Sequence, residues 1–292
     1  MSGHDHRERR TTDGSLVPKD DLKDARSHFA FGENWASYAA LIDDAAIAES
    51  KKGLLKLIPR EDFPGRSFMD IGCGSGLHAL AAAELGVGRI LAVDIDPVSV
   101  ETTKTVLTKR NVEIPWQAEN VSVFDLDPAR LGTFDIVYSW GVLHHTGDMW
   151  EAVRKAASMV APNGLFAFAL YRSTQMDPFW KIEKRWYTNA SPLAQKMAQK
   201  VYIGGYSVAR RLTGRGSFRD LVDNYRSARG MDFYHDVHDW LGGYPYEAAL
   251  APEIDERMKA MGFDAERVFA RSKPLGLFGS GCDEYVYRRK SA

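Results

Sequence analysis

The stretch that decides the fold is Phe68-Met-Asp-Ile-Gly-Cys-Gly-Ser-Gly-Leu-His78. Its first residues are apolar and typical of a strand, and the Ala- and Leu-rich residues that follow it are typical of a helix. Gly72, Gly74 and Gly76 lie between the two, where glycine lets the backbone take positive φ and approach a ligand closely. Asp70 lies two residues before Gly72. The pattern predicts a strand, a ligand-binding turn and a helix.

The rest of the chain repeats this alternation. Apolar runs of strand length, bounded by Gly, Pro or Asp, occupy residues 67–71, 89–95, 121–124, 134–140 and 165–171. Helical patterns occupy 77–85, 97–110 and 149–160, and two more are predicted within 27–58. Near the end, a helix is predicted over 253–261 and strands over 265–272 and 284–288. Together they predict an α/β fold with a doubly wound, mostly parallel seven-stranded sheet.

Composition shifts divide the chain into four segments. The charged residues 1–24 are predicted to be a disordered arm. Residues 25–171 are interpreted as an N-terminal helical cap and the ligand-binding core, and 251–292 as the final helix and an antiparallel hairpin of that core. Between them, residues 172–250 contain many aromatic residues and no strand pattern. This composition favours a helical lid inserted after the fifth strand, which we expect to bind the substrate.

Composition also limits the function. The 292 residues have a net charge of −1, which is not that of a protein whose whole surface attracts nucleic acid. Two cysteines, Cys73 and Cys282, exclude a disulfide framework and a cysteine-rich metal site, and they favour a cytoplasmic setting. No run of about 18 apolar residues and no signal-peptide pattern is present, so no membrane span or secretion is expected.

The spacing of the glycine loop indicates which ligand it takes. Dinucleotide enzymes use Gly-x-Gly-x-x-Gly, whereas this loop reads Gly-x-Gly-x-Gly after an acidic residue. A carboxylate at Asp70 would repel a pyrophosphate but would favour a ligand with ammonium and sulfonium charges. Twenty-two residues after Gly72, Asp94 ends the second predicted strand, where a carboxylate can accept both hydroxyls of a ribose.

With these motifs, residues 66–171 resemble the class I S-adenosylmethionine-dependent methyltransferases, in a branch that acts on small molecules or glycans. The resemblance implies that the cofactor is S-adenosylmethionine, that Asp70 orders the glycine loop around its methionine part, and that Cys73 is a small packing residue there. It also implies contacts further along the chain: Asp94 with the ribose, Ile95 and Phe124 or Leu126 with the adenine ring, Asp125 with the adenine amino group, and the backbone around Ser139 and Trp140 with the methionine end.

The candidate catalytic residues lie after the fourth strand and in the insertion. His144 and His145 follow that strand, and histidine suits base catalysis because its ordinary pKa is near 6.5. His144 is taken as the substrate-facing residue and His145, which matches the family's histidine, as a structural one. In the insertion, His235 or Tyr234 is a second candidate for base or orienting group. No metal is expected, because a lone His-x-x-His pair at His235 and His238 is weak evidence for one.

For the acceptor, the molecule that would receive the methyl group, the sequence predicts only a chemical class. Residues 178–230 contain eleven Lys or Arg and three acids, which favours an anionic small-molecule or glycan acceptor for an O-methyltransferase. Basic residues among apolar ones in 194–212 leave open a contact with a membrane surface. Two alternatives also remain open: an RNA or protein methyltransferase, although nucleic acid is not the expected partner, and a regulatory protein that binds the cofactor without turnover.

Overall fold

A computed structural model describes residues 21–23, 31–39, 42–214, 216–229 and 232–291. Its helices are η1 (Asp21–Lys23), α1 (Phe31–Ala39), α2 (Asp44–Leu57), η3 (Arg60–Asp62), α3 (Leu77–Glu84), α4 (Pro97–Lys109), η4 (Val123–Asp125), α5 (Pro128–Leu131), η5 (Leu143–His145), α6 (Met149–Ser158), α7 (Asp177–Thr188), α8 (Pro192–Leu212), α9 (Phe218–Arg229), α10 (Phe233–Gly242) and α11 (Ala251–Ala260). Its strands are β1 (Ser67–Ile71), β2 (Arg89–Asp94), β3 (Trp116–Asn120), β4 (Phe134–Trp140), β5 (Val160–Tyr171), β6 (Phe263–Phe269) and β7 (Cys282–Arg289).

The strands form one seven-stranded sheet in the order β3-β2-β1-β4-β5-β7-β6. All neighbouring strands are parallel except β7, which runs antiparallel to both β5 and β6. The strand order reverses between β1 and β4, and in open sheets of this kind ligands bind at the carboxyl ends of the strands beside that reversal. The predicted fold class is therefore confirmed.

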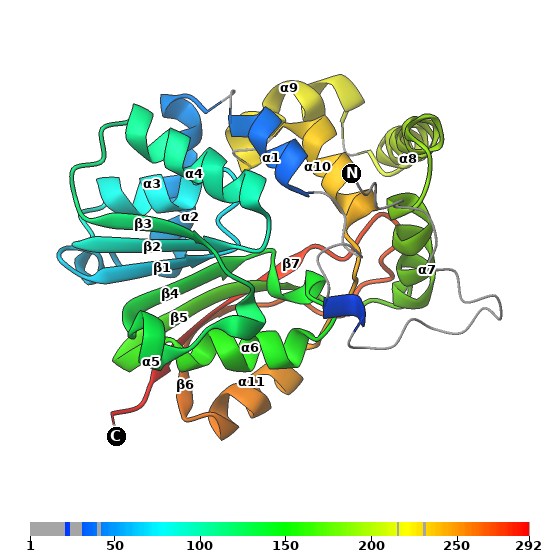
Figure 1. Cartoon of the computed structure of the whole chain (residues 1–292). Coiled ribbons are helices and arrows are strands. Elements are labelled where there is room, and N and C mark those ends of the chain that lie inside the picture. The colour runs from blue at the N-terminus through cyan, green and yellow to red at the C-terminus, as the bar shows by residue number, and fades with distance from the viewer. Residues whose placement is uncertain (1–20, 24–30, 40–41, 215, 230–231, 292) are drawn as a thin grey trace, which may run out of the picture.

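Helices cover both faces of the sheet (Figure 1). On one face, α2 and α3 bury apolar side chains against β1 and β2, in a core that includes Leu54, Phe68 and Leu80. On the other face, α6 and α11 pack on β4, β5 and β7, with Val153 and Met258 in the second core. The side chain of Asp148 caps α6, and that of Asp96 caps α4 directly before Pro97, the first residue of the helix.

The segment 172–250 contains four helices, α7 to α10, with an aromatic core of their own that includes Trp180, Tyr187 and Phe233. A buried ion pair between Arg172 and Asp283 ties the start of this segment to β7, and the Arg172 Nε lies 2.8 Å from the Asp283 Oδ1. Of the predicted arm, residues 21–23 form η1, and residues 1–20 and 24 lie outside the described residues.

One predicted strand is wrong. The third strand is Trp116–Asn120 and not 121–124, of which Val123 and Phe124 begin the 3₁₀ helix η4. β3 is an edge strand in which only Ala118 is buried, so its sequence lacks the continuous apolar run that marks a central parallel strand.

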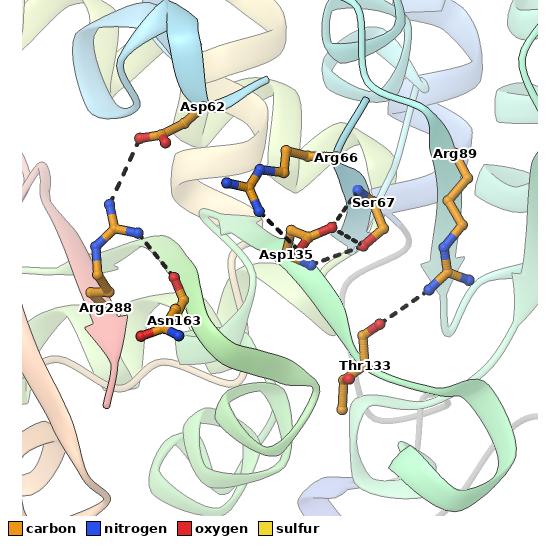
Figure 2. A network of polar contacts seen from close by, with 8 residues as sticks. All are labelled: Asp62, Arg66, Ser67, Arg89, Thr133, Asp135, Asn163 and Arg288. Carbon is orange, nitrogen blue, oxygen red and sulfur yellow. Dashed lines mark hydrogen bonds and ion pairs between the residues drawn. The ribbon is translucent and has the colours of Figure 1, made fainter. Parts of the chain in front are cut away.

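Polar contacts join the strands at the edge of the sheet where the parallel strands begin and β7 ends (Figure 2). The Asp135 carboxylate accepts hydrogen bonds from both the backbone N–H and the hydroxyl of Ser67, at 2.8 and 2.7 Å, which ties β4 to β1. Arg288 of β7 donates to the Asn163 carbonyl at 2.9 Å. These contacts fix the end of the sheet opposite the glycine loop. No helix among the described residues has the length and hydrophobicity that crossing a membrane requires.

Candidate functional site

The glycine loop begins where β1 ends at Ile71. Gly72, Gly74 and Gly76 have φ values of 75°, 51° and 76°, in the left-handed region that favours glycine. A side chain would also meet packed neighbours: a Cβ on Gly72 would lie 2.4 Å from Cγ2 of Val142, and one on Gly74 would lie 3.2 Å from Cγ of Trp35. The loop therefore requires glycine for both its conformation and its close packing.

Asp94 lies at the carboxyl end of β2 beside this loop. Its Oδ2 accepts from the Gly74 N–H at 3.0 Å and its Oδ1 accepts from the Asp96 N–H at 2.9 Å. Burial raises the pKa of Asp94 to about 6, and these hydrogen bonds oppose the rise. The side chain of Asn120 donates to the carbonyl oxygens of Asp94 and Ile95, so Asn120, which sequence reasoning missed, fixes the turn that carries both.

Asp70 is the most informative residue of the site. It is buried, and its Oδ2 has no hydrogen-bond partner among the described residues. Burial, together with the negative charge of Asp94, raises the pKa of Asp70 to about 7, against a backbone hydrogen bond at Ala79 that lowers it. An unpaired carboxylate oxygen in the interior is costly, and a bound cationic group would compensate it.

The predicted adenine contacts surround the end of β3. Phe124 is half-buried, and Nζ of Lys23 in η1 lies 4.8 Å from its ring centroid. Asp125 is exposed in η4, whereas Leu126 is buried in the core below α6. Of the two residues predicted to pack on the ring, Phe124 therefore has the more accessible surface.

The end of β4 completes the floor of the site. The buried Ser139 hydroxyl donates to the Ile71 carbonyl at 3.1 Å, which holds the glycine loop to β4. The half-exposed Trp140 ring donates from Nε1 to Oε1 of Glu284 at 3.0 Å. Cys73 is buried, its sulfur 3.2 Å from the Thr103 hydroxyl, and burial raises its thiol pKa, as suits a packing residue and not a nucleophile.

Helix α1 covers the glycine loop and meets α10 there (Figure 1). Trp35 packs on Gly74 and lies edge-on to Tyr38, with ring centroids 5.9 Å apart. His235 of α10 lies beside this pair, and its Nε2 is 3.4 Å from the Ser37 hydroxyl. Its Nδ1 is 2.9 Å from Oδ1 of Asp232, and that carboxylate also caps α10. Tyr234, the neighbouring candidate, is 53% exposed and packs on Phe233.

His144 and His145 lie deeper than the sequence suggests. His144 is fully buried, its Nδ1 is 3.3 Å from the Tyr171 N–H, and its Nε2 has no partner among the described residues. Burial lowers the pKa of His144 well below its ordinary value, so the ring is neutral. His145 Nδ1 is 2.8 Å from the Pro245 carbonyl, which makes His145 a bridge to the segment after α10.

A buried lysine adjoins these histidines, and sequence reasoning missed it. Lys184 of α7 donates to the Trp240 carbonyl, and its Nζ lies 3.7 Å from the Trp240 ring centroid. Tyr171, Trp180 and Tyr246 complete the aromatic surround, each with its ring centroid within 6 Å. Burial lowers the Lys184 pKa. The one sequence signal for Lys184 is its position in a helix, α7, that is rich in aromatic residues.

His238 does not join His235 in a metal site. Its Nδ1 is 2.7 Å from the Tyr187 hydroxyl, within the aromatic core of the insertion. In the part of the chain that the structure describes, no three His, Cys, Asp or Glu side chains are grouped to hold a metal ion.

The part of the chain that carries the glycine loop resembles a known protein family. Residues 69–168 match the family described as "Methyltransferase domain". The chain carries a methyltransferase domain. The glycine loop and the strand order of the sheet are those of a Rossmann-like fold.

The curated relatives match less than half of the chain. The ubiquinone biosynthesis O-methyltransferases of Xanthomonas campestris and Caulobacter are each 32% identical over 115 residues, which is 39% of this chain. The match covers 47% and 44% of those proteins, so the chain spans about half the length of the curated relatives it matches.

Solved structures share the fold over nearly the whole chain. Magnesium protoporphyrin IX methyltransferase from Synechocystis, with bound S-adenosylmethionine, superposes with a TM-score of 0.54 at 12% identity, over 96% of this chain and 100% of that one. A 1,6-didemethyltoxoflavin-N1-methyltransferase from Burkholderia thailandensis, with bound S-adenosylhomocysteine, gives 0.51 at 15% identity, over 96% and 93%. At these identities the likeness establishes the fold and leaves the acceptor to the side chains of the site.

Proposed function

We propose that this protein is an S-adenosylmethionine-dependent methyltransferase that methylates an oxygen atom of a small anionic acceptor. The observation that carries the cofactor assignment is the buried Asp70 with its unpaired Oδ2 beside a loop that only glycine can form. S-adenosylmethionine brings ammonium and sulfonium charges to this carboxylate, and its ribose hydroxyls suit the carboxylate of Asp94 at the end of β2. Bound there, the cofactor supplies an activated methyl group.

The chain's own contribution to the reaction is alignment and removal of a proton from the acceptor. The hydrogen bonds of each histidine decide which one can act as base. In His235, a hydrogen bond from Nδ1 to Asp232 leaves the lone pair on Nε2, on the side that faces Ser37 and Tyr38. In His144, Nδ1 accepts from the Tyr171 N–H, so the proton resides on Nε2 and no basic atom is free. We therefore assign the base to His235 and a donor role to His144.

The acceptor site on this proposal lies between η5, the end of β5 and α10. His144, Lys184 and Trp240 come together there, with the unpaired Nε2 of His144 and the unpaired Nε1 of Trp240 as buried donors. Buried donors beside a lysine suit an acceptor with negative charge. The similarity to ubiquinone biosynthesis O-methyltransferases supports oxygen as the acceptor atom.

Methyl transfer with radiolabelled S-adenosylmethionine tests the proposal. Acceptors would be screened in three groups: phenolic acids, acidic sugars, and neutral analogues of each. We expect labelled product with an anionic acceptor and little or none with its neutral analogue. Labelling of RNA or of a protein, with no small molecule labelled, would contradict the proposed acceptor class. Cofactor binding without turnover on any acceptor would favour a regulatory protein.

A further inference from the structure

Exposed large apolar side chains of the described residues gather at one end of the molecule. Among the described residues, every large apolar side chain that is more than half exposed, except that of Tyr234, lies in α7, in α8 or in the loop 275–277. Figure 1 shows α7 and α8 at the end of the molecule away from β3. These ten side chains are Phe179, Ile182, Trp186, Leu193, Met197, Val201, Val208, Leu212, Leu275 and Leu277, and we call them the apolar end.

The three segments of the apolar end adjoin one another. The Trp180 Nε1 of α7 donates to the Gly276 carbonyl at 2.7 Å, and the Tyr202 hydroxyl of α8 donates to the Phe278 carbonyl at 2.8 Å. The loop is therefore fastened to both helices. Many exposed large apolar side chains on neighbouring segments are uncommon on monomeric proteins, and large exposed apolar patches mark interaction sites.

Helix α8 carries apolar side chains on two faces, one packed on the insertion and one exposed. Its inward face, with Ala198, Tyr202 and Ile203, packs on the core of the insertion. At 3.6 residues per turn, its five large apolar residues share a single stripe on the opposite face, where Val201 is 75% exposed and Leu212 83%. No residue of this 21-residue helix is fully buried. Packing among the residues that the structure describes therefore does not explain the exposed stripe.

Positive charge flanks the stripe. From residue 184 to residue 219 the chain has eight Lys or Arg and no Asp or Glu. On the helical projection Lys196, Lys200 and Arg211 border one side of the stripe, and no ion pair with any of them is found among the described residues. A partner must therefore offer apolar surface and negative charge together.

We infer that the apolar end docks on the surface of a bilayer that contains anionic lipid. The stripe would enter the boundary between headgroups and acyl chains, and the flanking cations would contact lipid phosphates. Self-association fits less well, because two copies packed through α8 would bring together two helices without any acidic residue. A nucleic acid would match the charge but leave the stripe in water. This inference is independent of the proposed reaction.

Flotation of the full chain with vesicles tests the inference. We expect binding to vesicles of phosphatidylcholine and phosphatidylglycerol in equal amounts, at least about tenfold weaker binding to phosphatidylcholine alone, and weakening between about 0.1 M and about 0.5 M salt. The double variant Met197→Asp/Val201→Asp should reduce binding to anionic vesicles about tenfold or more. Val268→Asp on the edge strand β6, at an apolar residue that is 46% exposed and lies outside the apolar end, is the control and should bind as the unchanged protein does.

Three results would overturn the inference: no binding to either vesicle, binding that the double variant leaves unchanged, or a stable dimer in light scattering that the double variant dissociates. Because the substituted side chains are exposed, the thermal midpoint of each variant and its binding of S-adenosylmethionine report separately on folding and on the cofactor site. Failure of vesicle binding is therefore distinguishable from failure of the proposed function.

Discussion

At the residue scale, Asp94 and Asp70 have different proposed roles in cofactor binding. Asp94 accepts hydrogen bonds, whereas Asp70 supplies a negative charge. Asp94→Ala removes an acceptor for the ribose and for the Gly74 N–H, so we expect S-adenosylmethionine to bind more weakly by about 1–3 kcal/mol in calorimetry. Glu101→Ala, which removes an exposed carboxylate in α4, is the control and should bind normally. Unchanged affinity in the Asp94 variant would remove the residue from the ribose site.

Asp70 predicts a pH dependence whose sign follows from its raised pKa. A buried acid with a folded pKa of about 7 and an ordinary value of 3.8 favours the fold when protonated. The stability of the ligand-free protein should therefore fall as the pH rises from about 4 through 7. A cationic ligand favours the ionised form, so its affinity should rise over the same range. In Asp70→Asn, both dependences, measured by thermal unfolding and calorimetry, should flatten, and a cofactor affinity that still rises with pH would contradict the role of Asp70.

His235 and His144 predict opposite outcomes for catalysis. His235→Ala should lower kcat about 10²-fold or more while S-adenosylmethionine affinity stays the same, because it removes the basic Nε2. Asp232→Asn should lower kcat less and shift the pH–rate profile, since it alters only the partner of Nδ1. If His144→Ala abolishes turnover and His235→Ala does not, the assignment of the base is wrong.

At the element scale, sequence reasoning succeeded where one element carries its own signal. The boundaries of β1 and β4, the proline that begins α4, and the glycine loop follow from local chemistry. β3 was misplaced because an edge strand needs only one buried face. The choice between His144 and His235 was out of reach, since it depends on Tyr171 and Asp232, whose positions only the packing of β5 and α10 decides.

Helix α1 makes a prediction of its own as the cover of the glycine loop. Trp35→Ala would uncover Gly74 and admit water to the site, so we expect faster release of S-adenosylmethionine in stopped-flow measurements, by about tenfold. Trp186→Ala removes an exposed tryptophan of α7 and should leave the rate unchanged. Equal rates in both variants would mean that α1 does not close the site.

At the scale of the whole molecule, the insertion and the core are joined by a buried charge pair. Arg172 is 8% exposed and Asp283 1%, with two hydrogen bonds from the Arg172 Nε to the carboxylate. Arg172→Met would leave Asp283 buried with far less compensation, and we expect the free energy of unfolding to fall by about 3–5 kcal/mol in urea titration. Arg154→Met, which breaks an exposed pair with Glu151, should cost under about 1 kcal/mol.

Calorimetric titration of the full chain with S-adenosylmethionine and S-adenosylhomocysteine, with NADH as control, tests the central claim most directly. The loop geometry, the unpaired oxygen of Asp70 and the place of Asp94 predict that the first two bind in the micromolar range and that NADH does not. Failure of a folded protein to bind either ligand, or preference for NADH, would contradict the cofactor assignment and every step of the mechanism built on it.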